Sequence, residues 1–344
     1  MKRLFVFGGV IAGLLLVTAG FAFLQLNNFL HTAVDVGAEG SDFTIESGTP
    51  FRRVSDELAE RGIIADSRYF RLYARWTGKA SAVQAGDYLI RPGTTPVQLL
   101  EQFSSGDVRL YSFTIIEGWN QWDLLRALGE DANINASLTV EDWPALLEEL
   151  QVEFTHPEGL FLPETYRFPR NTSDRDVLAK AHAHMQEVLA EEWAARDAGL
   201  PIASPYEALI LASIVEKETA RADERPRIAG VFVRRLQKRM RLQTDPTVIY
   251  GIGSNFNGNL TRRDLQTDTP YNTYTRHGLP PTPIALPGRA AIHAALHPAD
   301  GEELYFVATG LGDGSHAFST TKEQHDEAVA RYLRQLRRQR QQGN

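Results

Sequence analysis

The chain has 344 residues, of which 43% are hydrophobic, 23% charged and 10% aromatic. This composition is typical of a packed globular protein and excludes a collagen, a disordered tail protein and a polytopic membrane protein. A net charge of -7 argues against a partner such as nucleic acid held over a broad surface. With no cysteine in the chain, disulfides, thiolate catalysis and Cys-ligated zinc are excluded.

An uncharged apolar run, residues 4–24, follows Lys2 and Arg3, although the mean hydropathy of the whole chain is only -0.28. As a helix the run would be about 32 Å long, enough to cross a hydrocarbon core. A cleaved signal peptide has a shorter apolar region, and a buried core helix is the remaining alternative. We expect an uncleaved anchor over residues 4–26, and the two basic residues predict that it leaves the N-terminus in the cytoplasm.

Three β–turn–α units are predicted after a polar linker over residues 27–40. They begin near residues 45, 90 and 116, and in each a β-type residue precedes a glycine turn and an amphipathic helix. In the second unit, Thr95 and Pro96 supply a helix cap and a first-position proline. A helix over 67–76 and a strand over 86–90 are also predicted. The glycine turns before short helices resemble the carbohydrate-binding LysM module.

A strong helix start lies at residues 204–207, with Ser at the N-cap, Pro at the first position and Glu at the third. Residues 208–215 are apolar or small on every face, which predicts a buried helix. Upstream, residues 135–200 are predicted to be mostly helical, with a Pro-, Gly- and acid-containing loop over residues 156–166.

Two carboxylates, Glu216 and Glu218, end this helix about 200° apart around its axis, so they face different environments. Glu218 shares the face of Leu211 and Ile214, where desolvation should raise its pKa. A raised pKa suits a general acid that works near neutral pH. The alternative is that one Glu is a surface residue and the other pairs with a cation such as Arg225.

Two downstream segments combine amides, hydroxyls and aromatic rings: LQTDPTVIYG at residues 242–251 and TPYNTYT at residues 269–275. A rigid stretch with three prolines, residues 278–284, follows them. Such side chains can form hydrogen bonds to sugar hydroxyls and stack on sugar C–H faces. Each segment alone is also compatible with an ordinary turn network, but together they indicate a polar, aromatic groove.

Two histidine pairs have spacings to compare with metal sites. His182 and His184 would point to nearly opposite sides of a helix. His293 and His297 have the i, i+4 spacing but lack the acid beside the first His of an HExxH motif. Both pairs therefore predict solvated or core histidines, and we expect no metal site and no cofactor.

These motifs closely resemble those of the MltG (YceG-like) family of endolytic murein transglycosylases. The resemblance rests on ASIVEKET at 212–219, LQTDPTVIYG at 242–251, YNTY at 271–274 and GLPP at 278–281. It covers nearly the whole chain, including the loop EGLFLPETY at 158–166 and a terminal His316-x-Phe318 element. Thr282 and Leu286 depart from the family pattern.

The resemblance implies an enzyme of the bacterial inner membrane that cleaves nascent peptidoglycan strands internally, in the periplasm. It would leave 1,6-anhydro-MurNAc ends and terminate strand elongation. Glu218, the second acid of the E-K-E triplet, would protonate the oxygen between MurNAc and GlcNAc and then deprotonate the C6 hydroxyl that closes onto C1. We assign substrate binding to Gln243, Asp245, Tyr271, Asn272, Tyr274, Glu164 and His316.

Two other functions remain open at this point. One is a hydrolytic muramidase in which Asp245 positions a water molecule. The other is a membrane-anchored scaffold that binds glycan without cleaving it.

The sequence thus predicts an α+β chain with a single transmembrane helix, a small LysM-like α+β module and a larger α+β catalytic domain. The predicted boundaries are a cytoplasmic tip at 1–3, the anchor at 4–26, the linker at 27–40, the module at 41–108, the catalytic domain at 109–335 and a tail at 336–344. The expected partners are peptidoglycan strands, the inner membrane and peptidoglycan synthases, with no nucleic acid.

Overall fold

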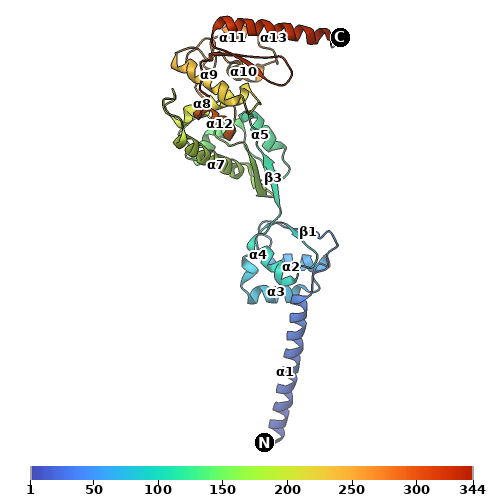
Figure 1. Ribbon diagram of the computed structural model, residues 1–344. Coiled ribbons are helices and arrows are strands. Elements are labelled where there is room, and N and C mark those ends of the chain that lie inside the picture. Colours follow the sequence, from blue (N-terminus) through green and yellow to red (C-terminus); the bar gives the residue numbers. More distant parts are fainter. Residues whose placement is uncertain (1, 343–344) are drawn as a thin grey trace. The chain divides into compact units, whose positions relative to one another are not determined.

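The computed structural model describes residues 2–342 and confirms a mixed α+β chain (Figure 1). The chain divides into two compact units, Met1–Tyr111 with Arg167–Asn171 and Ser112–Tyr166 with Thr172–Asn344. The division falls within strands β3 (Leu110–Thr114) and β5 (Thr165–Pro169), which pair with one another.

Helix α1 (Lys2–His31) contains the apolar run, and Gly13–His31 is long and apolar enough to cross a membrane. The helix continues beyond the predicted anchor, so the predicted linker at 27–40 is helical up to His31. Leu26, Phe29 and Leu30 extend an apolar face at helical spacing, and the last two are buried in the core of the first unit.

In the rest of the first unit, two helices separate two antiparallel strands along the sequence, and a third helix follows the second strand. Strands β1 (Ser41–Ile45) and β2 (Gly86–Ile90) pair so that Phe43 lies opposite Tyr88, and both rings pack against Phe103. The helices are α2 (Phe51–Glu60), α3 (Ser67–Trp76) and α4 (Pro96–Ser105), and a 3₁₀ turn lies at Lys79–Ser81.

The predicted β–turn–α units are confirmed, with β3 and α5 (Gln121–Glu130) as the third. Gly48, Gly93 and Gly118 adopt positive φ angles of 78°, 84° and 79° in the three turns, a conformation that glycine adopts without a steric penalty. The predicted cap also forms, because Thr95 and Gln98 make a capping box with Pro96 in the first turn of α4.

The second unit is mainly helical. Its helices and 3₁₀ turns are α5, η2 (Val140–Asp142), α6 (Trp143–Glu149), α7 (Asp174–Ala195), α8 (Pro205–Glu218), α9 (Arg225–Gln237), α10 (Asp245–Ile252), η3 (Gly253–Asn255), α11 (Arg262–Gln266), α12 (Arg289–Leu296) and α13 (Lys322–Gln342). Its short strands are β4 (Ile134–Asn135), parallel to β6 (Thr172–Ser173), and β7 (Tyr305–Ala308), antiparallel to β8 (His316–Ser319).

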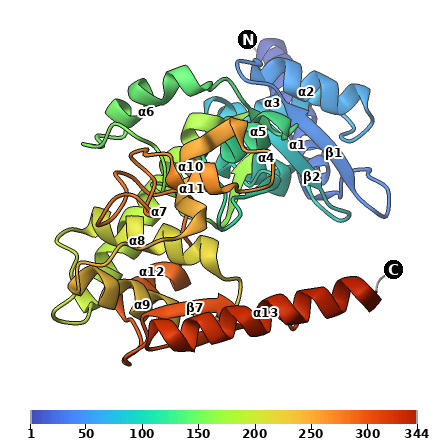
Figure 2. The ribbon, with the colours of Figure 1, turned by 90° about the horizontal axis from the view of Figure 1, so that it is seen from above.

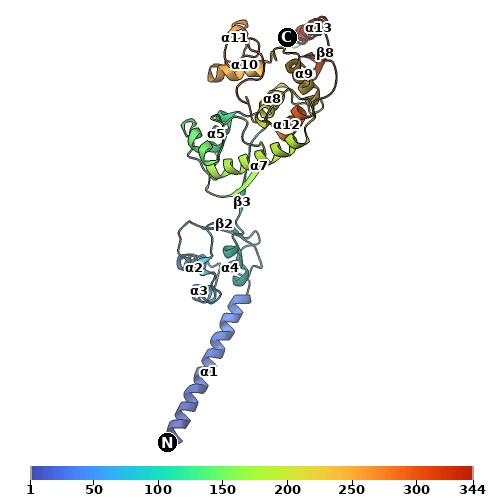
Figure 3. The same ribbon diagram turned by 90° about the vertical axis from the view of Figure 1, so that its left-hand side faces the viewer.

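Helix α8 is the centre of the second unit. Its residues 208–215 are all buried, as the sequence predicts. It packs against α12, α9, α7 and α10, and Figure 3 shows α8 and α12 side by side next to α7. At another surface of this unit, α13 runs along β7 (Figure 2). The predicted boundary between residues 335 and 336 lies inside this continuous helix.

Candidate active site

Helix α8 ends at Glu218, and local sequence features determine where the helix begins and ends. At its start, the Ser204 hydroxyl accepts a hydrogen bond from the Glu207 backbone N–H at 3.2 Å, and Pro205 occupies the first turn. At its end, Thr219 turns into an extended conformation with φ -149°. Glu218 is therefore the last helical residue, and it lies half-buried.

The carboxyl group of Glu218 lies in a setting that favours its neutral form. Burial raises its pKa to about 7, and the negative charge of Asp245 raises it as well. A hydrogen bond from the Thr244 hydroxyl to Oε1 and the positive charge of Arg235 act in the opposite direction. A carboxyl group that titrates near neutral pH can both donate and accept a proton.

Glu216 lies in a different setting. Its side chain is 5% exposed, its Oε1 lies 3.2 Å from an Arg225 guanidinium nitrogen, and its Oε2 accepts the Gly288 backbone N–H at 3.1 Å. Arg225 also pairs with Glu117 at 3.4 Å. Both oxygens of Glu216 are thus engaged in holding α8 to neighbouring segments, whereas the described contacts of Glu218 include a hydroxyl and no salt bridge.

Three buried threonines, Thr244, Thr247 and Thr273, form a hydrogen-bond network that ends at Glu218. Thr244, which carries the hydroxyl bound to Glu218, donates its backbone N–H to Thr273 Oγ1 at 3.1 Å. Thr247 donates its hydroxyl to the Thr244 carbonyl at 2.8 Å and lies 2.9 Å from the Thr273 hydroxyl. Since all three side chains are almost wholly buried, the network fixes where the Thr244 hydroxyl points.

Arg235 is a buried cation next to this network. Its guanidinium donates at 2.6 Å to the carbonyl of Leu242 and at 2.6 Å to the carbonyl of Leu304. Neither Arg235 nor Thr244 was assigned a role from the sequence, because their proximity to Glu218 depends on how α8, α9 and the segment before α10 pack together. Only the position of Thr244 inside a motif segment pointed to it.

Asp245 and Tyr274, both predicted from the sequence to bind substrate, are hydrogen-bonded to each other. The Tyr274 hydroxyl donates to Asp245 Oδ1 at 2.5 Å, and Asp245 is exposed at the start of α10. Burial, followed by this contact with Asp245, raises the pKa of Tyr274, so its hydroxyl stays a donor. The side chain of Gln243, one position before Thr244, is exposed, and its backbone has a positive φ of 52°.

Tyr271 and Asn272 have separate functions in the structure. The Tyr271 hydroxyl lies 2.8 Å from the Thr282 hydroxyl, and its ring packs edge-on against Tyr250. Asn272 is completely buried, and its amide donates to three backbone carbonyls while its oxygen accepts the Tyr274 N–H. With its polar atoms engaged, Asn272 holds the shape of the loop.

Glu164 and His316 have partners away from Glu218. Glu164 Oε2 lies 3.2 Å from His184 Nδ1 on α7. His316 Nδ1 lies 2.7 Å from Glu224 Oε2, and the His316 backbone N–H donates to the same carboxylate at 3.0 Å. The described contacts join neither residue to Glu218, Thr244 or Asp245.

A second buried acid, Glu158, lies beside a row of aromatic rings. It is fully buried, and its Oε2 accepts the Gln121 backbone N–H at 3.2 Å and the Tyr250 hydroxyl at 2.9 Å. Burial raises its pKa to about 8, so it is largely neutral at pH 7. The rings of Trp122 and Tyr271 lie 5.7 Å and 5.0 Å from that of Tyr250, which α10 carries at the end opposite Asp245.

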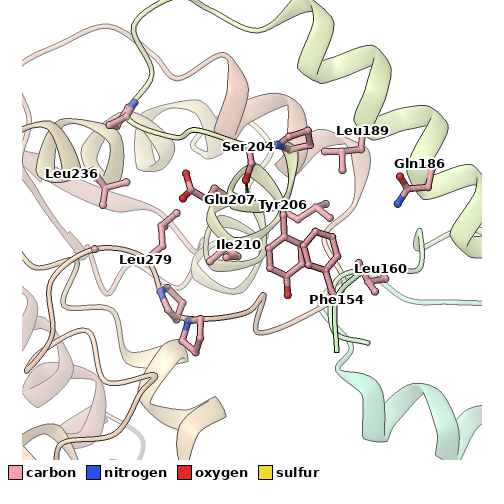
Figure 4. Close-up of a pocket in the computed structure, with 16 residues that line it drawn as sticks. Phe154, Leu160, Gln186, Leu189, Ser204, Tyr206, Glu207, Ile210, Leu236 and Leu279 are labelled. Carbon is pink, nitrogen blue, oxygen red and sulfur yellow. Dashed lines mark hydrogen bonds between the residues drawn. The ribbon is translucent and has the colours of Figure 1, made fainter. Parts of the chain in front are cut away.

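A cavity of about 720 Å³ lies at the other end of α8, about 20 Å along the helix from Glu218. Figure 4 shows its stacked rings, Phe154 and Tyr206, whose centroids are 3.8 Å apart. Leu160, Leu236 and Leu279 add apolar walls. The cavity contains none of the predicted site residues. Burial, followed by the charges of Tyr271 and Glu158, raises the pKa of Tyr206 to about 12. The cavity and the aromatic row are linked along the chain, because Pro281 lines the cavity and the next residue, Thr282, lies 2.8 Å from the Tyr271 hydroxyl.

Comparisons with known proteins decide the family. The sequence profile of the YceG-like family matches residues 43–331, most of the chain. The chain belongs to the YceG-like family.

Two relatives of this YceG-like chain are named endolytic murein transglycosylases. The one from Bacillus subtilis (strain 168) is 29% identical over 331 residues, which cover 91% of each chain. The one from Streptococcus pneumoniae (strain D39) is 27% identical over 322 residues, covering 84% of this chain and 58% of the relative. A crystal structure of a yceG-like protein from Listeria monocytogenes aligns with 85% of this chain and 99% of its own, at 26% identity and a TM-score of 0.49.

Proposed function

We propose that this YceG-like chain is an endolytic murein transglycosylase, a lytic enzyme that cleaves the glycan strands of peptidoglycan. The names of its relatives support this activity, since the Bacillus subtilis relative matches it over 91% of both chains. The observation in the structure that carries the proposal is Glu218. It is a half-buried acid with a pKa near 7 and, among the described residues, no salt bridge.

A single acid with this pKa suits a reaction that consumes no water. Protonated Glu218 gives its proton to the oxygen between MurNAc and GlcNAc, and the C1–O bond of MurNAc breaks as the GlcNAc hydroxyl leaves. The Glu218 carboxylate then takes the proton of the C6 hydroxyl of the same MurNAc, whose oxygen bonds to C1. The products are a 1,6-anhydro-MurNAc end and a free GlcNAc end, and Glu218 regains its proton.

The neighbours of Glu218 fit the charge changes in this sequence. Thr244 donates to the carboxylate formed in the first step and holds one oxygen in place, so the other is directed at the substrate. Asp245 would stabilise a positively charged sugar ring, and its exposure and its hydrogen bond from Tyr274 support this role. The exposed side chain of Gln243 and the rings of Tyr271, Tyr250 and Trp122 supply the hydrogen bonds and stacking faces of a glycan groove.

The first unit would hold the enzyme at its substrate. Helix α1 anchors the chain in the inner membrane with Lys2 and Arg3 in the cytoplasm, so that the rest of the first unit and the whole second unit lie in the periplasm. The module at 41–108 would be LysM-like and would bind the same strand; two helices that come between its antiparallel strands β1 and β2 in the sequence support this assignment. Peptidoglycan synthases, which produce nascent strands, are the partners this location suggests, and the cut would end elongation.

The test is the mass of the products. The full-length protein in detergent micelles is incubated with uncrosslinked glycan strands, and the new ends are weighed by mass spectrometry. Lytic cleavage gives ends lighter by one water than the reducing ends that a muramidase gives, and internal cleavage gives long fragments before disaccharides. Reducing ends would contradict the lytic mechanism, and uncut strands that still bind the protein would reduce it to a glycan-binding scaffold.

A further inference from the structure

Two histidines and a glutamate that have no place in this reaction form a cluster in the second unit. Glu192 comes from α7, His293 from α12, and His297 directly follows α12. Potential ligand atoms of the three side chains lie within 4.8 Å of one another. Glu192 Oε2 is 2.8 Å from His293 Nδ1, and the two imidazole rings are 4.3 Å apart. The sequence showed only the histidine pair without an acid beside it, and the fold brings that acid from another helix.

His297 is oriented as a metal ligand would be. Its Nδ1 lies 3.1 Å from Asp197 Oδ1, so this nitrogen carries the proton and donates it to the carboxylate. The other nitrogen, Nε2, then presents a lone pair, and it is buried without a hydrogen-bond partner among the described residues. A carboxylate bound to the far nitrogen is the usual support of a metal-binding imidazole.

Glu192 contributes a buried negative charge to the same place. Its side chain is 8% exposed, and Arg289 binds only one of its oxygens, Oε1, at 3.0 Å. The second oxygen, Oε2, faces the histidines. His293 is 58% exposed, so the cluster opens to solvent on one side and an ion can enter from there.

We propose that Glu192, His293 and His297 bind a Zn²⁺ ion, with water as the fourth ligand. Two imidazoles and one carboxylate suit zinc, whereas Mg²⁺ and Ca²⁺ prefer oxygen ligands alone. Bonds of about 2.0–2.2 Å place the ligand atoms of a tetrahedral ion about 3.5 Å apart. The present spread of up to 4.8 Å would therefore narrow and the 2.8 Å contact between Glu192 and His293 would give way to the ion, and the exposed His293 side chain has room to turn. The ion would tie α7 to α12, which packs against α8, and so brace the helix that carries Glu218.

The experiment measures zinc directly and does not depend on enzymatic activity. Tag-free full-length protein in detergent is stripped with EDTA, dialysed against Zn²⁺ and then against buffer, and its metal content and thermal midpoint are measured. One retained zinc ion per chain and a higher thermal midpoint support the site. The same treatment with Mg²⁺ should leave no bound ion and an unchanged midpoint. Co²⁺ in place of zinc should show the visible absorption of a four-coordinate ion.

Variants assign the ligands. His297→Ala and His293→Gln should each weaken zinc binding at least tenfold, while His277→Ala, which removes an exposed histidine elsewhere, should leave it unchanged. His293→Gln alters an exposed side chain and therefore keeps the test valid if His297→Ala does not fold. Less than half an equivalent of zinc in the wild type, or equal zinc binding by wild type and His293→Gln, overturns the proposal.

Discussion

Glu216 and Glu218 lie two residues apart on α8, but their carboxyl groups have different partners in the second unit. Burial raises the pKa of both. Around Glu216, the Gly288 N–H and the Arg225 guanidinium counter that effect, and they engage both of its oxygens. Around Glu218 one hydroxyl replaces the direct ion pair, and Asp245 adds a further negative charge. When no cation contacts a desolvated carboxyl group, its pKa stays raised, and the group can donate and accept a proton near neutral pH.

Replacing Glu218 should have the largest effect of the changes that test this difference. Glu218→Gln keeps an oxygen for the Thr244 hydroxyl but has no proton to give, so we expect the cleavage rate to fall by about 10³-fold or more. Its thermal midpoint should stay close to that of the wild type, because no ion pair is lost. Glu187→Gln, the same change at an exposed acid of α7, is the matched control and should cleave normally. A Glu218→Gln protein with wild-type turnover would place the catalytic acid elsewhere.

Glu158 extends the comparison to an acid without access to solvent. Burial raises its folded-state pKa to about 8 from an ordinary value of 4.5. Between these values the folded chain holds a proton that the unfolded chain has lost, so stability must fall as pH rises through this window. The fall due to Glu158 is on the order of 3 kcal/mol between pH 5 and pH 8.

Glu158→Gln should remove this part of the pH dependence, because glutamine has no proton to lose and still accepts from Tyr250 and Gln121. Urea unfolding at pH 5 and pH 8 measures the difference, with Glu153→Gln as the exposed control on the same loop. If wild type and Glu158→Gln lose equal stability over this range, Glu158 is ionised in the folded protein.

Glu216→Gln tests the other side of the comparison. It leaves Arg225, only 12% exposed, with Glu117 as its remaining acid, so we expect a loss of about 2 kcal/mol in unfolding free energy. Cleavage per folded molecule should stay within a fewfold of wild type. Denaturant unfolding and turnover at low temperature separate the two effects. A loss of turnover as large as that of Glu218→Gln, in a folded protein, would make both acids part of the chemistry.

Helical spacing was sufficient to predict that Glu216 and Glu218 lie on different faces of α8, because a residue shares its face with the neighbours three and four positions away. The buried core of α8, its cap and the glycine turns are local in the same sense and were predicted correctly. Whether Glu216 or Glu218 receives Arg225 depends on tertiary packing, and the sequence left that alternative open.

The partners of individual side chains could not be predicted, whether they lie a few residues away or in distant segments. Asn272 was assigned to sugar by its type, yet the structure uses its amide for backbone carbonyls of residues 264–267. Arg235 and Thr244 reach Glu218 only through packing, and Glu192 reaches His293 from another helix. Helix α1 extends to His31 because Phe29 and Leu30 find a core in residues that follow much later in the chain.

Thr244, which sequence reasoning passed over, gives the smallest predicted effect and the most specific one. Its hydroxyl donates to the ionised form of Glu218 and so lowers that pKa. Thr244→Val keeps the shape and removes the donor, which should raise the pKa of Glu218 by about one unit and slow cleavage about tenfold. Since the first step needs protonated Glu218, activity falls as pH rises through this pKa. The alkaline limb of kcat/KM should therefore move to higher pH in Thr244→Val and stay in place in Thr244→Ser. A slower Thr244→Val enzyme with an unshifted limb would mean that the hydroxyl only holds the loop and does not set the protonation of Glu218.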